Sequence, residues 1–318
     1  MKARMHALIS QVSEQMYERE QIMALSLLAG IAGMNTFLYG SPGTAKSLIS
    51  RRIASAFEVG EYFECLMNRF STPEEIFGPV SIKALKDDQY LRKTEHYLPK
   101  ADFAFLDEIW KASPAILNTL LTLVNEKTFK NGDMIQHVPL KVLMSASNEI
   151  PEPNQGLDAL YDRFILRLVV PPIQQAQNFH ALLQAKPSAA KIEAADALRI
   201  KKQELQQWRE QIHQVQLPVE VLKIFDAVKQ SLTDSFEEHA VYVSDRRWQR
   251  AAYLLKASAF INDRAEVNLL DLFILKHCLW SQIDDIDFVA QTIEQTILEI
   301  GLDSDLDLAG SIAQKEDA

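Results

Sequence analysis

One loop contains the residue types that bind phosphate, and it stands between a predicted strand and a predicted helix. The strand is the apolar run at 36–39, the helix spans 45–57, and the segment that joins them reads Gly40, Ser41, Pro42, Gly43, Thr44, Ala45, Lys46 and Ser47. At such a junction the backbone N–H groups face an anion, and the helix dipole favours negative charge. Lys46 would reach the β- and γ-phosphates of a nucleotide, and the Ser47 hydroxyl would bind Mg²⁺. The loop therefore predicts a site for ATP with Mg²⁺.

The loop departs from the strict phosphate-binding pattern at one position, where Ala45 stands in place of glycine. Alanine narrows the backbone freedom of the loop, but its methyl group has too little bulk to push the loop off the phosphates. An ordinary strand-to-helix turn is the alternative explanation of the same residues. A second motif is needed to decide between the two.

Two adjacent carboxylates, Asp107 and Glu108, follow another apolar run at 103–106. Four apolar residues predict a buried strand, and ligands of an open parallel sheet bind beyond the carboxyl ends of its strands. Asp107 can help to hold Mg²⁺, usually through water, and Glu108 can polarise an attacking water. Taken alone, such a pair is often a charge pair at a helix start. Placed 61 residues after Lys46 (107 − 46), with room for one intervening strand, it predicts ATP hydrolysis.

The composition is that of a globular protein of ordinary usage. The chain has 318 residues, of which 47% are hydrophobic and 24% charged, and its net charge is −10. An acidic balance opposes non-specific nucleic-acid binding, so nucleic acid is not the expected partner. Cys65 and Cys278 lie far apart in apolar surroundings and are expected to be reduced core residues. With no apolar stretch long enough to span a bilayer and no secretory pattern at Met1, a cytoplasmic location is expected.

The predicted elements divide the chain into a strand–helix part and a helical part. Strands are expected at 36–39, 62–67, 103–106, 141–146 and 165–170, and helices beyond Pro172 at 174–184, 192–213, 218–235, 245–260, 269–280 and 286–298. This change of pattern predicts an α/β nucleotide-binding core at 1–172 and an all-helical lid at 173–302. The acidic segment 303–318 is expected to be a disordered tail.

Three further segments accompany the core. The segment 6–29 has helical spacing, and within it Tyr17 and Ile22 could form a wall against an adenine base or be plain core residues. The stretch 80–98 is expected to form an inserted hairpin with its turn at 86–88. A second hairpin is expected at 128–138, because Asn131-Gly132 between Thr128-Phe129 and Met134-Ile135 is a strong turn signal.

Taken together, these motifs resemble an AAA+ ATPase of the MoxR branch. Within it, the segments 69–78 (RFSTPEEIFG), 105–112 (FLDEIWKA), 114–121 (PAILNTLL) and 242–248 (YVSDRRW) are similar to the regulatory ATPase variant A (RavA) subfamily. The resemblance extends over nearly all of residues 1–300. It implies a five-stranded parallel P-loop sheet of order 5-1-4-3-2 with helices on both faces, an all-α lid, and a hexameric ring.

The resemblance also implies roles for polar residues outside the two nucleotide motifs. Asn148, at the end of the fourth core strand, corresponds to sensor 1, which orients the attacking water. Arg163 corresponds to the arginine finger that acts on the ATP of the neighbouring subunit, with Arg167 as a rival on the next strand. Arg246 corresponds to sensor 2 in the lid, although the adjacent Arg247 could serve instead. Whether Arg246 acts within its own subunit or on a neighbour is left open.

The function implied by the resemblance is ATP-driven remodelling or maturation of protein complexes, together with a von Willebrand factor A (vWA) domain partner. In this branch the two hairpins face the pore of the ring, where they would contact a client protein. A magnesium-chelatase-like metal-insertion motor is the nearest alternative, and a nucleic-acid-dependent motor is a weaker one. A nucleotide-sensing scaffold that does not hydrolyse ATP is disfavoured by Glu108, since a scaffold has no need of a base.

Overall fold

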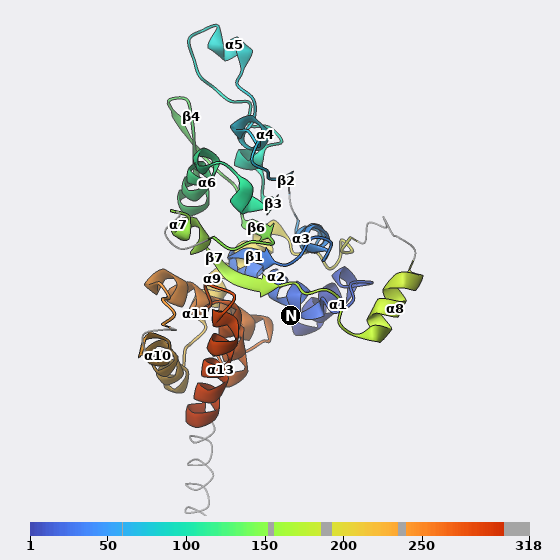
Figure 1. The fold of residues 1–318 in the computed structure, drawn as a ribbon, viewed down its shortest axis with the longest axis vertical. Helices are drawn as coiled ribbons and strands as arrows, with labels where there is room; N and C mark the ends of the chain where they lie inside the picture. Colours follow the sequence, from blue (N-terminus) through green and yellow to red (C-terminus); the bar gives the residue numbers. More distant parts are fainter. Residues whose placement is uncertain (59, 152–155, 186–192, 235–239, 302–318) are drawn as a thin grey trace, which may run out of the picture. The chain divides into compact units, whose positions relative to one another are not determined.

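The computed structural model describes the chain except for residues 59, 152–155, 186–192, 235–239 and 302–318. It divides into two compact units, one formed by Ala3–Gln207 and the other by Met1–Lys2 with Trp208–Ala318. The first unit contains the sheet and the second is helical (Figure 1). The expected tail at 303–318 lies outside the described residues. Among the residues that the structure describes, no helix is both long and apolar enough to cross a membrane.

A five-stranded parallel sheet forms the centre of the first unit. Its strands are β1 (Asn35–Tyr39), β2 (Tyr62–Leu66), β3 (Phe103–Asp107), β6 (Val142–Ser147) and β7 (Phe164–Val169). They lie side by side in the order β2-β3-β6-β1-β7. Since β6 and β7 are the fourth and fifth core strands along the chain, the predicted order 5-1-4-3-2 is confirmed. Every residue of β6 is buried, as expected for a strand covered on both faces.

Helices cover both faces of this sheet, because successive side chains of a strand point to opposite faces. On one face, Phe37, Leu106 and Leu143 belong to a single core with the apolar side of α6 (Pro114–Glu126). The helices α2 (Glu20–Ala32) and α3 (Lys46–Ser55) contact the strands instead, α2 against β1 and β7 and α3 against β3 and β6. The predicted fold class is therefore confirmed.

The N-terminal segment is helical, as its spacing indicates, but it is divided into two helices. It forms α1 (Lys2–Val12) and α2, separated by the connection at 13–19. Gln15 and Glu18 in this connection have φ of 61° and 60°, a left-handed conformation that an α-helix cannot accommodate. Tyr17 therefore lies on a non-helical turn and Ile22 on the first turns of α2.

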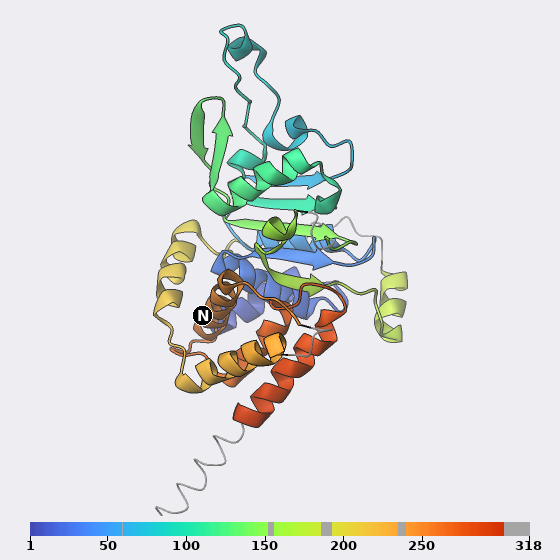
Figure 2. The same ribbon diagram turned by 60° about the vertical axis from the view of Figure 1, so that its left-hand side comes forward.

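The two insertions are real but differ in detail from the predicted hairpins. The stretch 80–98 carries α5 (Ile82–Leu85) at its tip and only an isolated bridge between Val80 and Arg92, so it is not a regular hairpin. It follows the short helix α4 (Pro73–Phe77). The second insertion is the hairpin of β4 (Thr128–Asn131) and β5 (Met134–His137), as expected. Figure 2 shows both insertions at the same end of the unit.

The turn of the second hairpin lies one residue later than predicted, at 132–133, because Asn131 is still paired in β4. The Asn131 side chain bonds the backbone of the other insertion. The Asn131 amide accepts a hydrogen bond from the Arg92 N–H (2.7 Å) and donates one to the Arg92 carbonyl (3.0 Å). A single buried side chain thus extends the backbone pairing of one insertion to the other, and the two insertions are joined where they pass each other.

The predicted boundary at residue 172 marks the end of the sheet, whereas the compact units divide after Gln207. Residues between these points contact the first unit, as shown by the bridge between Phe57 and Ile200 and the ion pair between Arg4 and Glu204. The helices of this part are α8 (Ala176–Gln184) and α9 (Lys202–Gln214). The predicted helix 192–213 is thus confined to its second half.

The remaining helices form the second unit. They are α10 (Val219–Asp234), α11 (Asp245–Ile261), α12 (Leu269–Leu272), the 3₁₀ turn η3 (Phe273–His277), α13 (Asp285–Thr296) and the terminal turn η4 (Ile297–Gly301). The predicted helix at 269–280 is therefore replaced by a short α-helix and a 3₁₀ turn.

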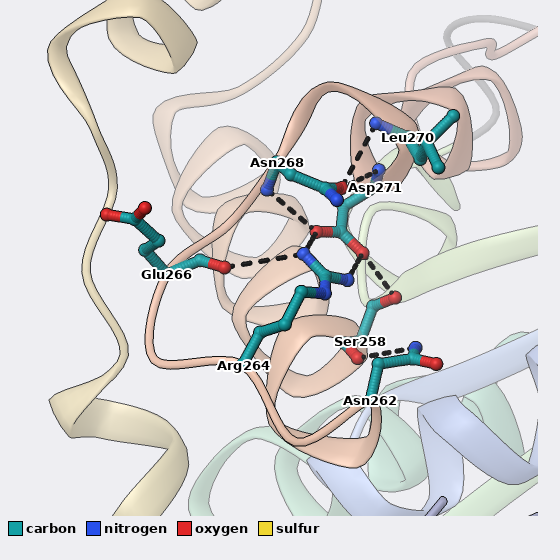
Figure 3. A network of polar contacts seen from close by, with 7 residues as sticks. All are labelled: Ser258, Asn262, Arg264, Glu266, Asn268, Leu270 and Asp271. Atoms are coloured by element: carbon teal, nitrogen blue, oxygen red, sulfur yellow. Dashed lines mark hydrogen bonds and ion pairs between the residues drawn. The ribbon is translucent and has the colours of Figure 1, made fainter.

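A buried carboxylate holds the start of α12 in place (Figure 3). Asp271, of which 3% of the side chain is exposed, forms a two-point ion pair with the Arg264 guanidinium at 2.6 and 2.7 Å. It also accepts hydrogen bonds from the Ser258 hydroxyl (2.6 Å) and the Asn268 N–H (3.0 Å). The hydrogen bonds to Asp271 raise the pKa of the Arg264 guanidinium. One side chain thus connects the end of α11 to the cap of α12.

We expect Asp271→Asn to lower the free energy of unfolding by about 2 to 3 kcal/mol, because it leaves a guanidinium without its carboxylate. The figure is at the lower end for a buried pair, since 28% of the Arg264 side chain is exposed. Urea titration followed by tryptophan fluorescence measures the change. Asp263→Asn, at a carboxylate whose side chain is 58% exposed, is the matched control and should change little. Equal midpoints for the two variants would contradict the proposed importance of this network.

Candidate active site

The predicted phosphate loop follows β1 and ends in α3, and its backbone explains the residue types. Gly40 is hydrogen-bonded through its N–H to the Ser147 carbonyl (3.1 Å), and a Cβ there would lie 2.4 Å from the Val170 carbonyl oxygen. Any other residue would collide with that backbone. Gly43 has φ of 82° and open space around it, so the backbone conformation, not crowding, favours glycine there.

Ala45, where the strict pattern has glycine, adopts the left-handed conformation that glycine prefers. Its φ is 70° and its ψ is 22°, and it directly precedes the first residue of α3. An alanine in this conformation costs about 1 kcal/mol relative to glycine. The loop therefore keeps the expected path in spite of the substitution, at the cost of a small local strain.

Lys46 is directed into the loop that it terminates. Its ammonium group donates hydrogen bonds to the Gly40 carbonyl (2.7 Å) and the Ser41 carbonyl (2.9 Å), and the residue is only 6% exposed. Burial lowers the pKa of Lys46, and the carboxylates of Asp107 and Glu108 partly oppose that shift. A cation held at this point is placed to bind an anion that enters the loop.

Ser47 and Asp107 come together at the end of β3. The Ser47 hydroxyl donates to one carboxylate oxygen of Asp107 at 3.2 Å, and the other oxygen accepts the Glu108 N–H at 3.1 Å. A hydroxyl and a carboxylate are oxygen donors of the kind that Mg²⁺ prefers, so this pair would help to hold the ion, directly or through water. In the described part of the chain, no group of three or more His, Cys, Asp or Glu side chains is arranged to hold a metal ion. Further ligands would therefore be phosphate oxygens and water, as is usual for Mg²⁺.

Glu108 is held by two side chains that the sequence analysis did not identify. One of its carboxylate oxygens accepts a hydrogen bond from the Ser147 hydroxyl (3.3 Å) and forms an ion pair with Lys111 (3.0 Å). Lys111 lies in the 3₁₀ turn η2 (Ile109–Lys111), three residues after Glu108. A lysine three residues after a glutamate is a local pattern from which the ion pair of Lys111 with Glu108 could have been predicted. Ser147 is close because β6 lies beside β3, which no local pattern shows.

The backbone of Glu108 is left-handed, with φ of 53° and ψ of 41°. A non-glycine residue in this region is uncommon, and such strain gathers at functional sites. It turns the chain sharply after β3. As a result, the side chains of Asp107 and Glu108 both stay at the edge of the sheet, with 14% of the Glu108 side chain exposed.

Asn148 directly follows β6 at the same edge. The Asn148 side-chain oxygen is buried and has no hydrogen-bond donor among the described residues. A buried acceptor of this kind requires a donor such as water. The register places Ala146 of β6 opposite Asp107 of β3, so Asn148 stands beside the carboxylates. Its predicted role of orienting a water is compatible with this position and stays a prediction.

Four arginines were candidates for contact with phosphate, and their burial separates them. Arg167 is 0% exposed and Arg247 4% exposed. Arg247 donates to the Leu279 carbonyl and the Ser281 hydroxyl inside its own unit. Neither guanidinium is at the surface, so neither can be presented to another subunit. Arg163, half-buried at the start of β7, and Arg246, exposed on α11, are the accessible members of the two pairs.

The adenine wall proposed for Tyr17 and Ile22 stays a prediction. Tyr17 is half-buried on the turn between α1 and α2, and Ile22 is 9% exposed on α2. The adjacent Arg19 donates to the Pro171 carbonyl, and the Glu18 carboxylate accepts the N–H groups of Gln174 and Gln175. This turn is therefore attached to the segment that follows β7.

Comparisons with known proteins show the family of the chain. Residues 3–210 match the family described as the MoxR domain of the MoxR-vWA-beta-propeller ternary systems, and residues 220–293 match an AAA lid domain. Two uncharacterized proteins of Methanocaldococcus jannaschii are 40% and 39% identical over 277 and 269 residues, which is 87% and 84% of this chain and 70% and 69% of theirs.

Two further similarities are more distant, one in sequence and one in structure. A structural protein of Acidianus two-tailed virus is 31% identical over 145 residues, 44% of this chain and 24% of that protein. Among solved structures, a "putative ATPase" of Cytophaga hutchinsonii matches with a TM-score of 0.72 and 17% identity, covering 93% of this chain and 94% of that one. At this identity the likeness concerns the fold.

Proposed function

The chain belongs to the MoxR-type AAA+ ATPases, and from that premise we propose that it is an Mg²⁺-dependent ATPase that works as a ring and remodels protein complexes. The observation that carries the proposal is the convergence of Lys46, Ser47, Asp107 and Glu108 at one edge of the sheet. The closer likeness to the RavA subfamily belongs to the proposal and rests on the sequence motifs alone.

Each residue of this edge has a separate task in the proposed reaction. Lys46 and the loop N–H groups bind the phosphates, and Ser47 with Asp107 holds Mg²⁺, which supplies charge neutralisation when bound. Glu108 accepts the proton of the attacking water, with Ser147 and Lys111 holding its carboxylate in place. Asn148 orients that water. Arg163 extends to the ATP of the next subunit, where a fixed guanidinium offsets charge that develops on the transferred phosphoryl group.

The proposed function also includes a partner protein and a client protein. The matched family is described by its association with vWA proteins, which supports a vWA-domain partner for this chain. The two joined insertions expose apolar side chains, among them Ile82 and Ile135, each 74% exposed. We assign them to contact with a client protein. The free thiols of Cys65 and Cys278 agree with a cytoplasmic location, which is part of the same proposal.

The ring is tested by light scattering at micromolar concentration, with and without a non-hydrolysable ATP analogue. ATP bound at Lys46 should also contact Arg163 of the neighbour, so the analogue is expected to raise the molar mass to that of an oligomer. Phosphate release in the presence of Mg²⁺ tests the activity in the same samples. A monomer under both conditions would contradict the ring, and no phosphate release from a folded oligomer would contradict the ATPase.

A further inference from the structure

Arg167 is a charged residue in the least favourable surroundings of the first unit. It lies within β7, between apolar residues, and is 0% exposed. Removing a charge from water costs several kcal/mol unless the protein supplies well-placed partners. Its burial excludes a direct contact with nucleotide on another subunit. What the side chain touches is therefore the only guide to what it does.

The guanidinium of Arg167 bonds the backbone on either side of Arg163. Its Nε donates to the Phe164 carbonyl (3.0 Å) and one terminal nitrogen donates to the Tyr161 carbonyl (3.0 Å). The guanidinium carbon also lies 3.7 Å from the centre of the Tyr161 ring, a cation–π distance. Tyr161 is two residues before Arg163 and Phe164 is one residue after it, so Arg167 spans the turn that carries Arg163.

The same turn is fixed from two other directions. The Asn35 side chain on β1 donates to the Arg163 carbonyl at 3.2 Å. The rings of Tyr161 and Phe164 both pack on Phe37, with centroids 5.7 and 5.9 Å away. Among these anchors only Arg167 bonds both sides of Arg163. The turn also leads from the four-residue helix α7 (Asp158–Tyr161), which is too short to hold its own end rigidly.

We propose that Arg167 is a positioning residue that fixes the backbone from which Arg163 reaches the neighbouring subunit. The proposal rests on the proposed function, in which Arg163 acts on the ATP of that neighbour. A finger of this kind works only if its guanidinium is held in place, and a misplacement of 1 Å can cost about 10²-fold in rate. The planar fork of arginine bonds the two carbonyls from different nitrogens while its face lies on the Tyr161 ring, a combination that the point-like ammonium of lysine does not offer.

The test compares Arg167→Met with Arg52→Met. Arg52 is a matched control because it is a buried arginine of the same unit, 5% exposed, that donates to the backbone carbonyls of Val12 and Glu14. We expect Arg167→Met to lower kcat at least about tenfold with little change in ATP affinity, and Arg52→Met to leave kcat within about twofold. Urea midpoints of both variants separate positioning from unfolding. If Arg167→Met does not fold, Arg167→Lys takes its place, with a smaller expected loss.

Two further measurements show whether Arg167 acts through Arg163. In an Arg163→Ala background, Arg167→Met should reduce kcat by less than about twofold more, because the group it positions is already gone. Mixed rings give the second measurement. Arg167→Met subunits mixed with Lys46→Ala subunits should recover turnover, since the intact nucleotide site of one then meets a correctly held Arg163 on the other.

The outcomes separate this inference from the proposed function. If Arg163→Ala subunits recover turnover with Lys46→Ala subunits and Arg167→Met subunits do not, the finger stands and the role of Arg167 is wrong. An equal loss of kcat for Arg52→Met, or full additivity with Arg163→Ala, also overturns that role. If neither mixture recovers although mixed rings form, the finger itself is wrong and the inference is wrong with it.

Discussion

Glu108→Gln is expected to lower ATP turnover by at least about 10²-fold and to leave ATP binding intact. The amide has the size of the carboxylate and can still accept the Ser147 hydroxyl, but it can neither take a proton from water nor pair with the charge of Lys111. The site would therefore fill and stall. Phosphate release under saturating ATP, together with equilibrium binding of a fluorescent ATP analogue, measures the two effects separately.

Glu126→Gln serves as the control, because Glu126 is an exposed glutamate at the end of α6. It should hydrolyse ATP at the parental rate. If Glu108→Gln also hydrolyses ATP at the parental rate, Glu108 is not the base that accepts the proton of the attacking water. The stalled variant has a second use, since affinity capture with it should retain the client protein.

Lys46→Ala is expected to weaken ATP binding by at least about 10²-fold, because it removes the ammonium group that the loop directs toward the phosphates. The two carbonyls to which it donates would then face the anion without a cation between them. Isothermal titration with ATP and Mg²⁺ measures the loss. Lys141→Ala is the matched control. Lys141, just before β6, is also a largely buried lysine, but it pairs with Asp102, just before β3, at the amino-terminal edge of the sheet. Equal affinities for the two variants would contradict the phosphate site.

The sheet and the polar residues at its carboxyl edge could be predicted because local patterns determine them. Apolar runs of four to six residues gave the strands, and polar residues at their ends gave Lys46, Asp107, Glu108 and Asn148. In a parallel sheet these ends meet at one edge, so contacts between residues far apart in the sequence follow from the strand order. The strand order itself came from the family resemblance.

The features that were wrong or missed depend on contacts that no local pattern contains. Asn131-Gly132 is a strong turn signal, yet the turn lies one residue later because Asn131 is still paired in β4, where its side chain also bonds Arg92 of the other insertion. In the N-terminal segment, apolar residues with helical spacing lie on both sides of Gln15 and Glu18. These two residues have a left-handed backbone, which separates α1 from α2. Arg167 looked like a rival to Arg163, and only its burial in β7 shows that it cannot reach a neighbouring subunit.

The most direct test of the central claim, catalysis between subunits, mixes two variants that each have strongly reduced turnover. Arg163→Ala keeps an intact nucleotide site and lacks the finger, whereas Lys46→Ala keeps the finger and lacks the site. Mixed rings are expected to recover part of the parental turnover, because an intact site then meets an intact Arg163 on its neighbour. A finger that acts within its own subunit predicts no recovery, since no single chain holds both groups. Phosphate release that does not rise above that of the separate variants, in a mixture shown to form mixed rings, would contradict the account.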